Sequence, residues 1–136
     1  MALVTFSAIV EFALKGEESG IGFFSSSLQA APETGKDVLA RSRTEAEKNL
    51  KMFRTILREN VTEIVMEPCE ALDEAAYLCD FSGGDALKKS LELLEKQRDF
   101  LRRAAGAVNL AEVKRAFQKI ADRKGRLISE ISRLAG

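Results

Sequence analysis

Four long segments of this chain carry apolar residues at alternating steps of three and four, the spacing that places side chains on one face of an α-helix. The first segment runs from about Ala2 to Gln29 or Ala31, where Pro32 ends it. Its apolar stripe comprises Phe6, Ile9, Val10, Ala13, Ile21, Phe24 and Leu28. Helices with one apolar face must bury that face against each other, so the pattern favours an all-α protein.

The remaining segments predict three further helices. We expect a second helix from about Asp37 to Asn60, after a short connection at residues 34–36, and a third from about Asp85 to Ala105, stopped by Gly106. A fourth helix begins after Asn109, whose side chain can cap it. The short links predict two antiparallel hairpins, and the less regular stretch 61–84 predicts one crossover between them. Residues 1–136 are therefore predicted to form a single domain, an antiparallel four-helix bundle with one crossover segment.

Composition narrows the classes of function. Lys plus Arg equals Asp plus Glu, at 21 each, so charge gives no reason to expect nucleic acid as a partner. No apolar run approaches the ~18–20 residues that span a bilayer, and we expect no membrane partner and no signal peptide. The cysteines, Cys69 and Cys79, form no Cys-x-x-Cys motif, which favours a reduced, cytoplasmic setting. His is absent, so a metal site would need carboxylates or Cys.

Polar residues interrupt the apolar stripes at Glu17, Asn49, Arg98 and Lys124, with Gln97 nearby. A carboxylate on a core-facing stripe is costly unless it is paired, metal-bound or protonated. One interpretation pairs Glu17 with Lys124 inside the bundle, with Asn49 as a hydrogen-bonding neighbour. The other interpretation places one or both charged groups at the bundle edge, because Lys has a long stem that can reach water.

The two hairpins also read as copies of each other. Aligning the first helix with the third places Glu17 on Leu94. Aligning the second helix with the fourth places Ala46 on Lys124 and Asn49 on Leu127. The match lies in the pattern of residue types more than in identity, and it indicates a two-fold internal repeat.

At these residues the chain resembles the rubrerythrin-like branch of the ferritin-like superfamily. In that branch a Glu precedes an aromatic pair by about seven residues on the first and third helices, and here Glu17 precedes Phe23-Phe24. The runs EAEKNLKMF and EVKRAFQKIADRKGRLISEI are similar to the surroundings of the family's Glu-x-x-His motifs. The stretch ALDEAAYLCDFSGGDALKKSLELLEK is similar to the family's crossover entering the third helix. The resemblance implies a ferritin-like bundle over nearly the whole chain.

The same resemblance implies that the family's di-iron centre has been lost. That centre takes a Glu from each of the first and third helices and a Glu-x-x-His from each of the others. The corresponding positions here form a vestigial site at Glu17, Ala46, Asn49, Leu94, Lys124 and Leu127. Only Glu17 keeps a ligand, so we expect no cofactor, no metal and no catalytic residue.

The leading expectation is therefore a non-catalytic bundle that acts as a structural or protein-interaction module. The resemblance implies a homodimer, because bundles of this branch commonly pair through a helical face. That face could be supplied by the extra apolar residues of the first helix, or these could pack under the crossover segment instead. They are Leu3, Val4, Phe12 and Phe23.

Two alternatives remain open. The first is a metal-binding oxidoreductase with a shifted carboxylate site that combines Glu17 with Glu45 or Glu47. The second is a small-ligand binder that uses the vacated metal position. Space for that ligand would come from Gly16, Gly20 and Ala46. Cys79 and Tyr77 are interpreted as packing residues rather than a redox pair.

Overall fold

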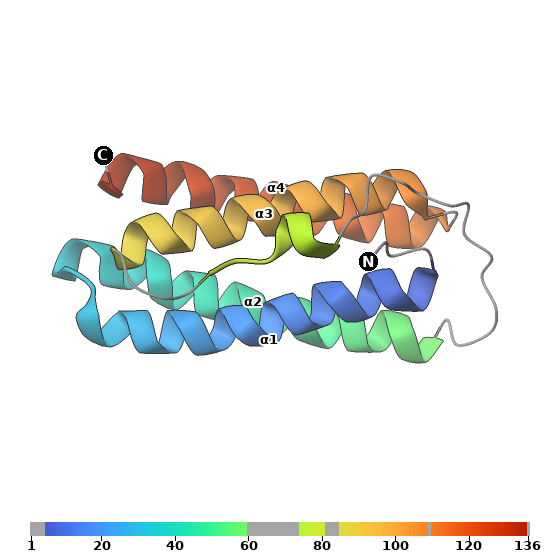
Figure 1. Cartoon of the computed structure of the whole chain (residues 1–136), viewed down its shortest axis with the longest axis horizontal. Helices are drawn as coiled ribbons and strands as arrows, with labels where there is room; N and C mark the ends of the chain where they lie inside the picture. Colours follow the sequence, from blue (N-terminus) through green and yellow to red (C-terminus); the bar gives the residue numbers. More distant parts are fainter. Residues whose placement is uncertain (1–4, 60–73, 81–84, 109, 136) are drawn as a thin grey trace.

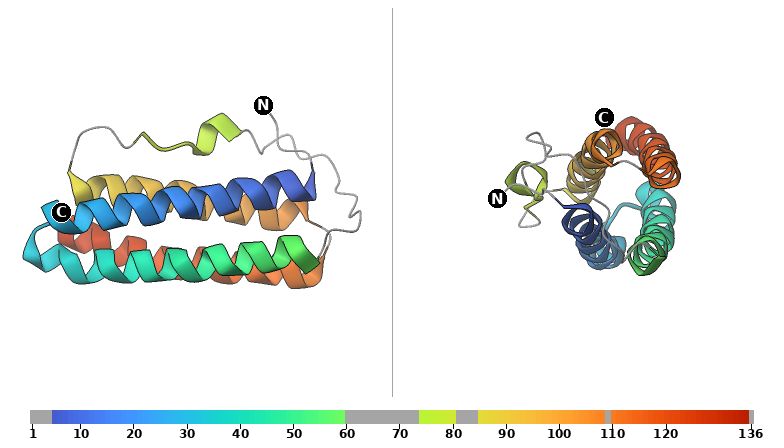
Figure 2. Two further views of the ribbon diagram at one scale, coloured as in Figure 1. Left: turned by 90° about the horizontal axis from the view of Figure 1, so that it is seen from below. Right: turned by 90° about the vertical axis from the view of Figure 1, so that its right-hand side faces the viewer.

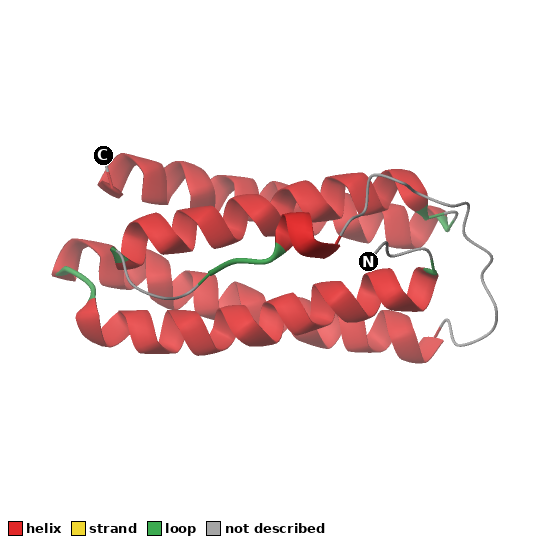
Figure 3. Ribbon diagram, viewed as in Figure 1, coloured by secondary structure: helices red, strands yellow, loops and turns green. Residues whose placement is uncertain are grey.

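The computed structural model describes residues 5–59, 74–80, 85–108 and 110–135, and everything regular in them is helical (Figures 1 and 3). The elements in chain order are α1 (Phe6–Ala30), α2 (Glu33–Glu59), the 3₁₀ helix η1 (Glu74–Tyr77), α3 (Ala86–Ala107) and α4 (Ala111–Ala135). The predicted all-α helical bundle is confirmed for these residues. None of the helices described is long and apolar enough to cross a membrane.

The four α-helices surround one common axis, as the end view in Figure 2 shows. α1 packs along α2 and α3 packs along α4, and further contacts join α1 to α3 and α2 to α4. α1 and α4 therefore lie diagonally opposite each other. In Figure 1 α2 ends at one end of the bundle and α3 begins at the other. η1 lies outside the four helices and contacts α3 (Figure 2).

Helix boundaries differ from the sequence prediction at three places. α1 begins at Phe6 rather than near Ala2, because Thr5 has an extended backbone and caps the helix. α2 begins at Glu33 rather than Asp37, because Pro32 suits a helix start and its carbonyl accepts a 2.8 Å bond from Gly35 N. A Cβ at Gly35 would lie 3.0 Å from Leu87 Cδ2, so glycine serves close packing there rather than a connection. α3 continues through Gly106 to Ala107, so the predicted stop is wrong. The predicted cap at Asn109 falls outside the described residues.

Side chains cap the starts of α1 and α3. The hydroxyl of Thr5 accepts a 3.1 Å hydrogen bond from Ala8 N at the start of α1. The carboxylate of Asp85 accepts one of 2.8 Å from Leu87 N at the start of α3, as predicted. Such caps satisfy backbone donors that the first helical turn leaves unpaired.

The core consists of two apolar clusters, one toward each end of the bundle. The first apolar cluster contains, among others, Phe6, Ile9, Val10, Phe53, Phe100, Leu101, Phe117 and Ile120. The second apolar cluster contains, among others, Phe24, Val38, Leu39, Leu87, Leu93, Leu94, Leu127 and Ile131. Every α-helix contributes to both clusters, so a single bundle core is interrupted part-way along its length.

Some apolar residues at helical spacing are not fully buried, while two serines are. Leu134 is 44% exposed, and other apolar residues are only partly buried: Ile21, Leu28, Leu50, Leu57 and Leu91. Ser42 and Ser90 are buried instead. Their hydroxyls donate to the carbonyls of Val38 at 2.8 Å and of Ala86 at 2.7 Å. This bond to the preceding turn lets a serine occupy the core face without an unpaired hydroxyl.

Candidate functional site

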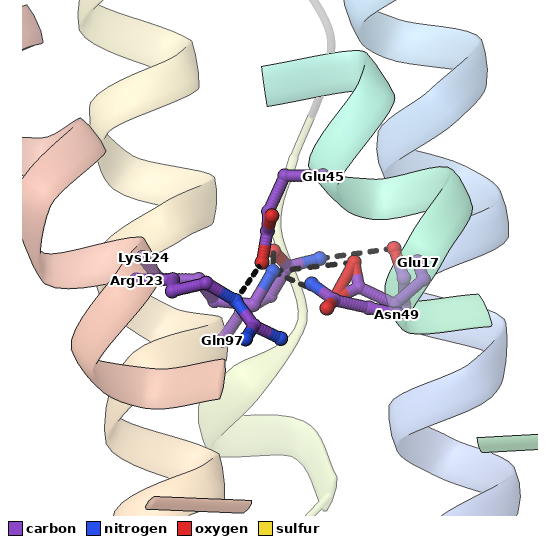
Figure 4. A network of polar contacts seen from close by, with 7 residues as sticks. Glu17, Glu45, Asn49, Gln97, Arg123 and Lys124 are labelled. Carbon is purple, nitrogen blue, oxygen red and sulfur yellow. Dashed lines mark hydrogen bonds and ion pairs between the residues drawn. The ribbon is translucent and has the colours of Figure 1, made fainter. Parts of the chain in front are cut away.

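A layer of polar side chains separates the two apolar clusters. Each α-helix supplies one member, and we call the set the polar layer (Figure 4): Glu17 of α1, Asn49 of α2, Gln97 of α3 and Lys124 of α4. On every helix the member lies between the residues that the helix gives to the first cluster and those it gives to the second. The layer is therefore the polar centre of an otherwise apolar interior.

An ion pair crosses the middle of this layer. Lys124 Nζ lies 2.6 Å from Glu17 Oε1 and 3.2 Å from Oε2. The two side chains are 1% and 2% exposed. Because α1 and α4 are diagonal neighbours, the pair spans the bundle interior rather than one of its faces. The interior interpretation of Glu17 and Lys124 is confirmed, and the interpretation that either reaches the bundle edge is wrong.

The remaining members complete a hydrogen-bond network around the pair. Asn49 Nδ2 donates to Glu17 Oε1 at 3.1 Å, and Lys124 Nζ donates to Gln97 Oε1 at 2.9 Å. Gln97 Nε2 in turn donates to the carbonyl of Gly16 at 3.0 Å. Asn49 Oδ1 is buried and has no hydrogen-bond partner among the described residues. The network thus satisfies both charged groups and leaves one neutral acceptor unused.

Gln97 was expected only near the polar positions, whereas Arg98 was expected among them. In the structure Arg98 Nε pairs with Asp99 at 3.1 Å and takes no part in the layer. Gln97 lies three residues after Leu94 and four before Leu101, and Arg98 lies four after Leu94 and three before Leu101, so periodicity alone does not choose between them.

Two of the three glycines of α1, Gly16 and Gly20, lie against the Gln97 amide. A Cβ at Gly16 or at Gly20 would lie 3.6 Å from Gln97 Nε2, and one at Gly20 would lie 3.7 Å from Leu93 Cδ2. These are ordinary contact distances, so the glycines permit close packing of α3 without being sterically required. Of the residues expected to leave space for a ligand, Gly16 lines the side cavity described below, whereas Gly20 is buried against α3.

A second ion pair lies beside the layer, at the edge between α2 and α4. Arg123 Nε is 2.6 Å from Glu45 Oε1 (Figure 4). Glu45 therefore faces a guanidinium rather than Glu17, and Glu47 is exposed. Among the residues described, no group of three or more His, Cys, Asp or Glu side chains could hold a metal ion. The carboxylates expected for a shifted metal site do not converge.

The six positions of the vestigial site are all buried. Glu17, Asn49 and Lys124 come together in the polar layer. Leu94 and Leu127 belong to the second apolar cluster, and Ala46 is buried one turn before Asn49. The donor atoms that a metal would need are thus confined to the side chains that already bind one another.

A cavity of about 220 Å³ adjoins the layer between α1, α3 and residues 77–79, and we call it the side cavity. Its apolar lining comprises Phe12, Ala13, Phe53, Tyr77, Leu78, Cys79, Leu93, Phe100 and Leu101. Its other lining residues are Lys15, Gly16, Glu17, Ser19, Lys96 and Gln97. The space therefore lies beside the expected metal position, and Ala46 does not line it.

Aromatic side chains that line the side cavity pack against one another. The ring of Phe100 lies 4.8 Å from Phe12 and 5.2 Å from Tyr77, measured between ring centroids. Phe12 of α1 and Tyr77 of η1 therefore pack against the same ring of α3. Burial raises the pKa of the Cys79 thiol, and nearby Glu92 raises it further. A thiol of raised pKa stays protonated and is a weak nucleophile, which agrees with a packing role for Cys79.

No protein-family model matches this chain, and comparison with curated proteins and with solved structures finds no significant similarity. The polar layer and the side cavity are therefore the features from which we infer function.

Proposed function

We propose that this chain is a non-catalytic, antiparallel four-helix bundle of ferritin-like topology, with an internal ion pair where a di-iron centre would lie. It acts as a structural or protein-interaction module of the cytoplasm. The observation that carries the proposal is the Lys124 ammonium at 2.6 Å from Glu17, in the centre of the bundle. A cation of the protein itself neutralises the one carboxylate that remains from the expected ligand set.

The arrangement of the helices supports the topology. α1 with α2 and α3 with α4 form the two contacting pairs of consecutive helices. Because α2 ends at one end of the bundle and α3 begins at the other, the chain between them must travel the length of the bundle (Figure 1). A single long connection of this kind distinguishes ferritin-like bundles from simple up-and-down ones.

The chemistry of the six positions supports the absence of redox function. Transition metals in such centres are bound by carboxylate oxygens and imidazole nitrogens. Ala46, Leu94 and Leu127 offer no donor atom, and Lys124 presents N–H donors with a positive charge. The Glu17 oxygens already accept bonds from Lys124 and Asn49. A metal at this place would have to displace a buried ammonium group.

Metal analysis tests the proposal. Protein purified without chelators from medium containing iron, manganese and zinc should carry far less than one equivalent of any of them. The Glu17→Gln variant should give the same low metal content as the wild type. Stoichiometric metal that is lost in Glu17→Gln would overturn the proposal in favour of a metalloprotein.

The resemblance alone also leads us to propose a homodimer. Light scattering coupled to size exclusion should then give twice the mass of one chain. A monomer mass over the whole accessible concentration range would contradict this part of the proposal and leave the ion-paired centre untouched.

A further inference from the structure

We propose that the side cavity is a binding site for a small amphipathic anion, with an apolar body inside the cavity and a carboxylate at its mouth. This goes beyond the proposed function, since it concerns a site next to the polar layer and not the layer itself.

Size and lining define the apolar body. The cavity measures about 220 Å³ and is walled by aromatic rings together with leucines. A dry cavity of about 150 Å³ with a similar lining binds benzene, so this one suits an apolar group of roughly nine carbons. Ligand pockets typically combine such an apolar lining with a few polar groups that fix orientation.

Charge decides which way the ligand points. Glu17 lines the cavity and is 2% exposed, and its carboxylate already accepts from Lys124 and Asn49, so this polar part of the lining offers no free cation to an anionic head group. Lys15 and Lys96 line the same cavity from α1 and α3 and are the cations of its lining. Lys15 is exposed and makes no ion pair with any described residue. Lys96 is 32% exposed in its side chain, and its Nζ already lies 3.4 Å from Glu92 Oε1. An anionic head group therefore belongs at the mouth of the cavity beside Lys15, the lining cation that has no ion pair with a described residue.

The segment after η1 forms the outer wall. Lys96 Nζ donates to the carbonyl of Leu78 at 2.5 Å, and Lys89 Nζ donates to that of Asp80 at 2.8 Å. The edge-on contact between Tyr77 and Phe100 adds an apolar attachment. Lys96 therefore lines the cavity and also binds the segment that forms its outer wall.

The chain provides its own probe, because Tyr77 is the only tyrosine and tryptophan is absent. Titration of the wild type with octanoate should change tyrosine fluorescence to saturation at one site. Octanoate should bind about two- to fivefold more tightly than 1-octanol, the range that one exposed ion pair supplies, and octylamine should bind most weakly. Absence of a saturable change with all three compounds would overturn the site. Equal affinity for octanoate and octylamine would overturn its charge preference.

The Lys15→Glu variant tests the charge preference at the mouth of the cavity, and Lys48→Glu is a matched control. Both lysines are exposed residues of helices, and neither pairs with a described residue, but only Lys15 lines the cavity. Lys15→Glu should weaken octanoate binding severalfold and leave 1-octanol unchanged, whereas Lys48→Glu should alter neither. The same loss of octanoate affinity in both variants would reduce the effect to net charge and contradict the proposal.

Cys79 gives an independent readout, because it lines the cavity. In a Cys69→Ser background Cys79 is the only thiol of the chain. Saturating octanoate should slow its alkylation by iodoacetamide at least twofold, while acetate at the same concentration should not. An unchanged rate with octanoate would place the ligand elsewhere.

Discussion

Two neighbouring residues of α4, Arg123 and Lys124, hold carboxylates at the same distance in different surroundings. Arg123 Nε and Lys124 Nζ each lie 2.6 Å from a glutamate oxygen. The Arg123 and Glu45 side chains are 33% and 15% exposed, whereas Lys124 and Glu17 are 1% and 2% exposed. Water can replace either partner of the edge pair, whereas the inner pair is almost completely buried. Although the two distances are equal, we expect removal of one partner to lower the free energy of unfolding far more for the inner pair than for the edge pair.

Lys124→Met should have the largest effect, because it leaves the Glu17 carboxylate buried without a cation. We expect a loss of about 3–5 kcal/mol in the free energy of unfolding, measured by urea denaturation at neutral pH. Lys119→Met, at an exposed position of the same helix, should change it by less than about 0.5 kcal/mol. A loss below about 1 kcal/mol for Lys124→Met would mean that Glu17 does not depend on its partner.

The double variant Glu17→Met/Lys124→Met should recover much of that loss, since it removes both buried charges. Exchange of a buried ion pair for apolar residues is often neutral or stabilising by about 1–4 kcal/mol. Gln97 and Asn49 each lose a partner, so we expect recovery of at least about 2 kcal/mol rather than full gain. A complete double-mutant cycle measures the coupling. Additive losses would show that the two groups act independently.

Arg123→Ala should have a smaller effect, up to about 1 kcal/mol, because the edge pair with Glu45 is partly exposed. The difference from the wild type should shrink between 0.05 M and 1 M NaCl, where screening weakens exposed charge pairs. The Lys124→Met loss should keep most of its size over the same range. If both losses respond equally to salt, the contrast between the two pairs is wrong.

Arg41→Gln should have the smallest effect and should reveal itself through pH. Arg41 binds Glu130 on α4, and this bond holds the pKa of the Glu130 carboxyl below its ordinary value of 4.5. A lowered pKa in the folded protein gives stability that is present above pH 4.5 and is lost as pH falls through the lowered value. The side-chain hydrogen bonds of Arg41 to Glu130 and Asp37 raise the pKa of Arg41, so its guanidinium stays charged throughout. The unfolding curves of wild type and Arg41→Gln should therefore converge in acid and separate above that range.

The helices and the inner ion pair could be predicted because each leaves a periodic signal. Lys124 falls between Ile120 and Leu127 on one stripe, and Glu17 falls between Ala13 and Ile21 on another. Pairing them needed only the bundle and the cost of a buried charge.

Other features leave no such signal in the sequence. The burial of Ser90 depends on a hydrogen bond from its hydroxyl to the carbonyl of Ala86 in the preceding turn, which a hydrophobicity pattern does not register. The edge pair of Arg123 with Glu45 depends on how α4 is rotated against α2. The side cavity depends on where Tyr77 settles against Phe100, and this is a long-range contact of an irregular segment. Such features follow from tertiary placement rather than local pattern.

The polar layer also fixes how far each helix can slide along its neighbours. A shift of α4 by one helical turn, about 5.4 Å, would keep an apolar stripe facing the core but would carry Lys124 into an apolar cluster and leave Glu17 alone. Leucine-rich stripes by themselves tolerate such slippage, whereas a single buried polar contact can select one register. The polar layer therefore selects one axial register for all four helices, because its hydrogen bonds form only when its four members lie at the same level: Glu17, Asn49, Gln97 and Lys124.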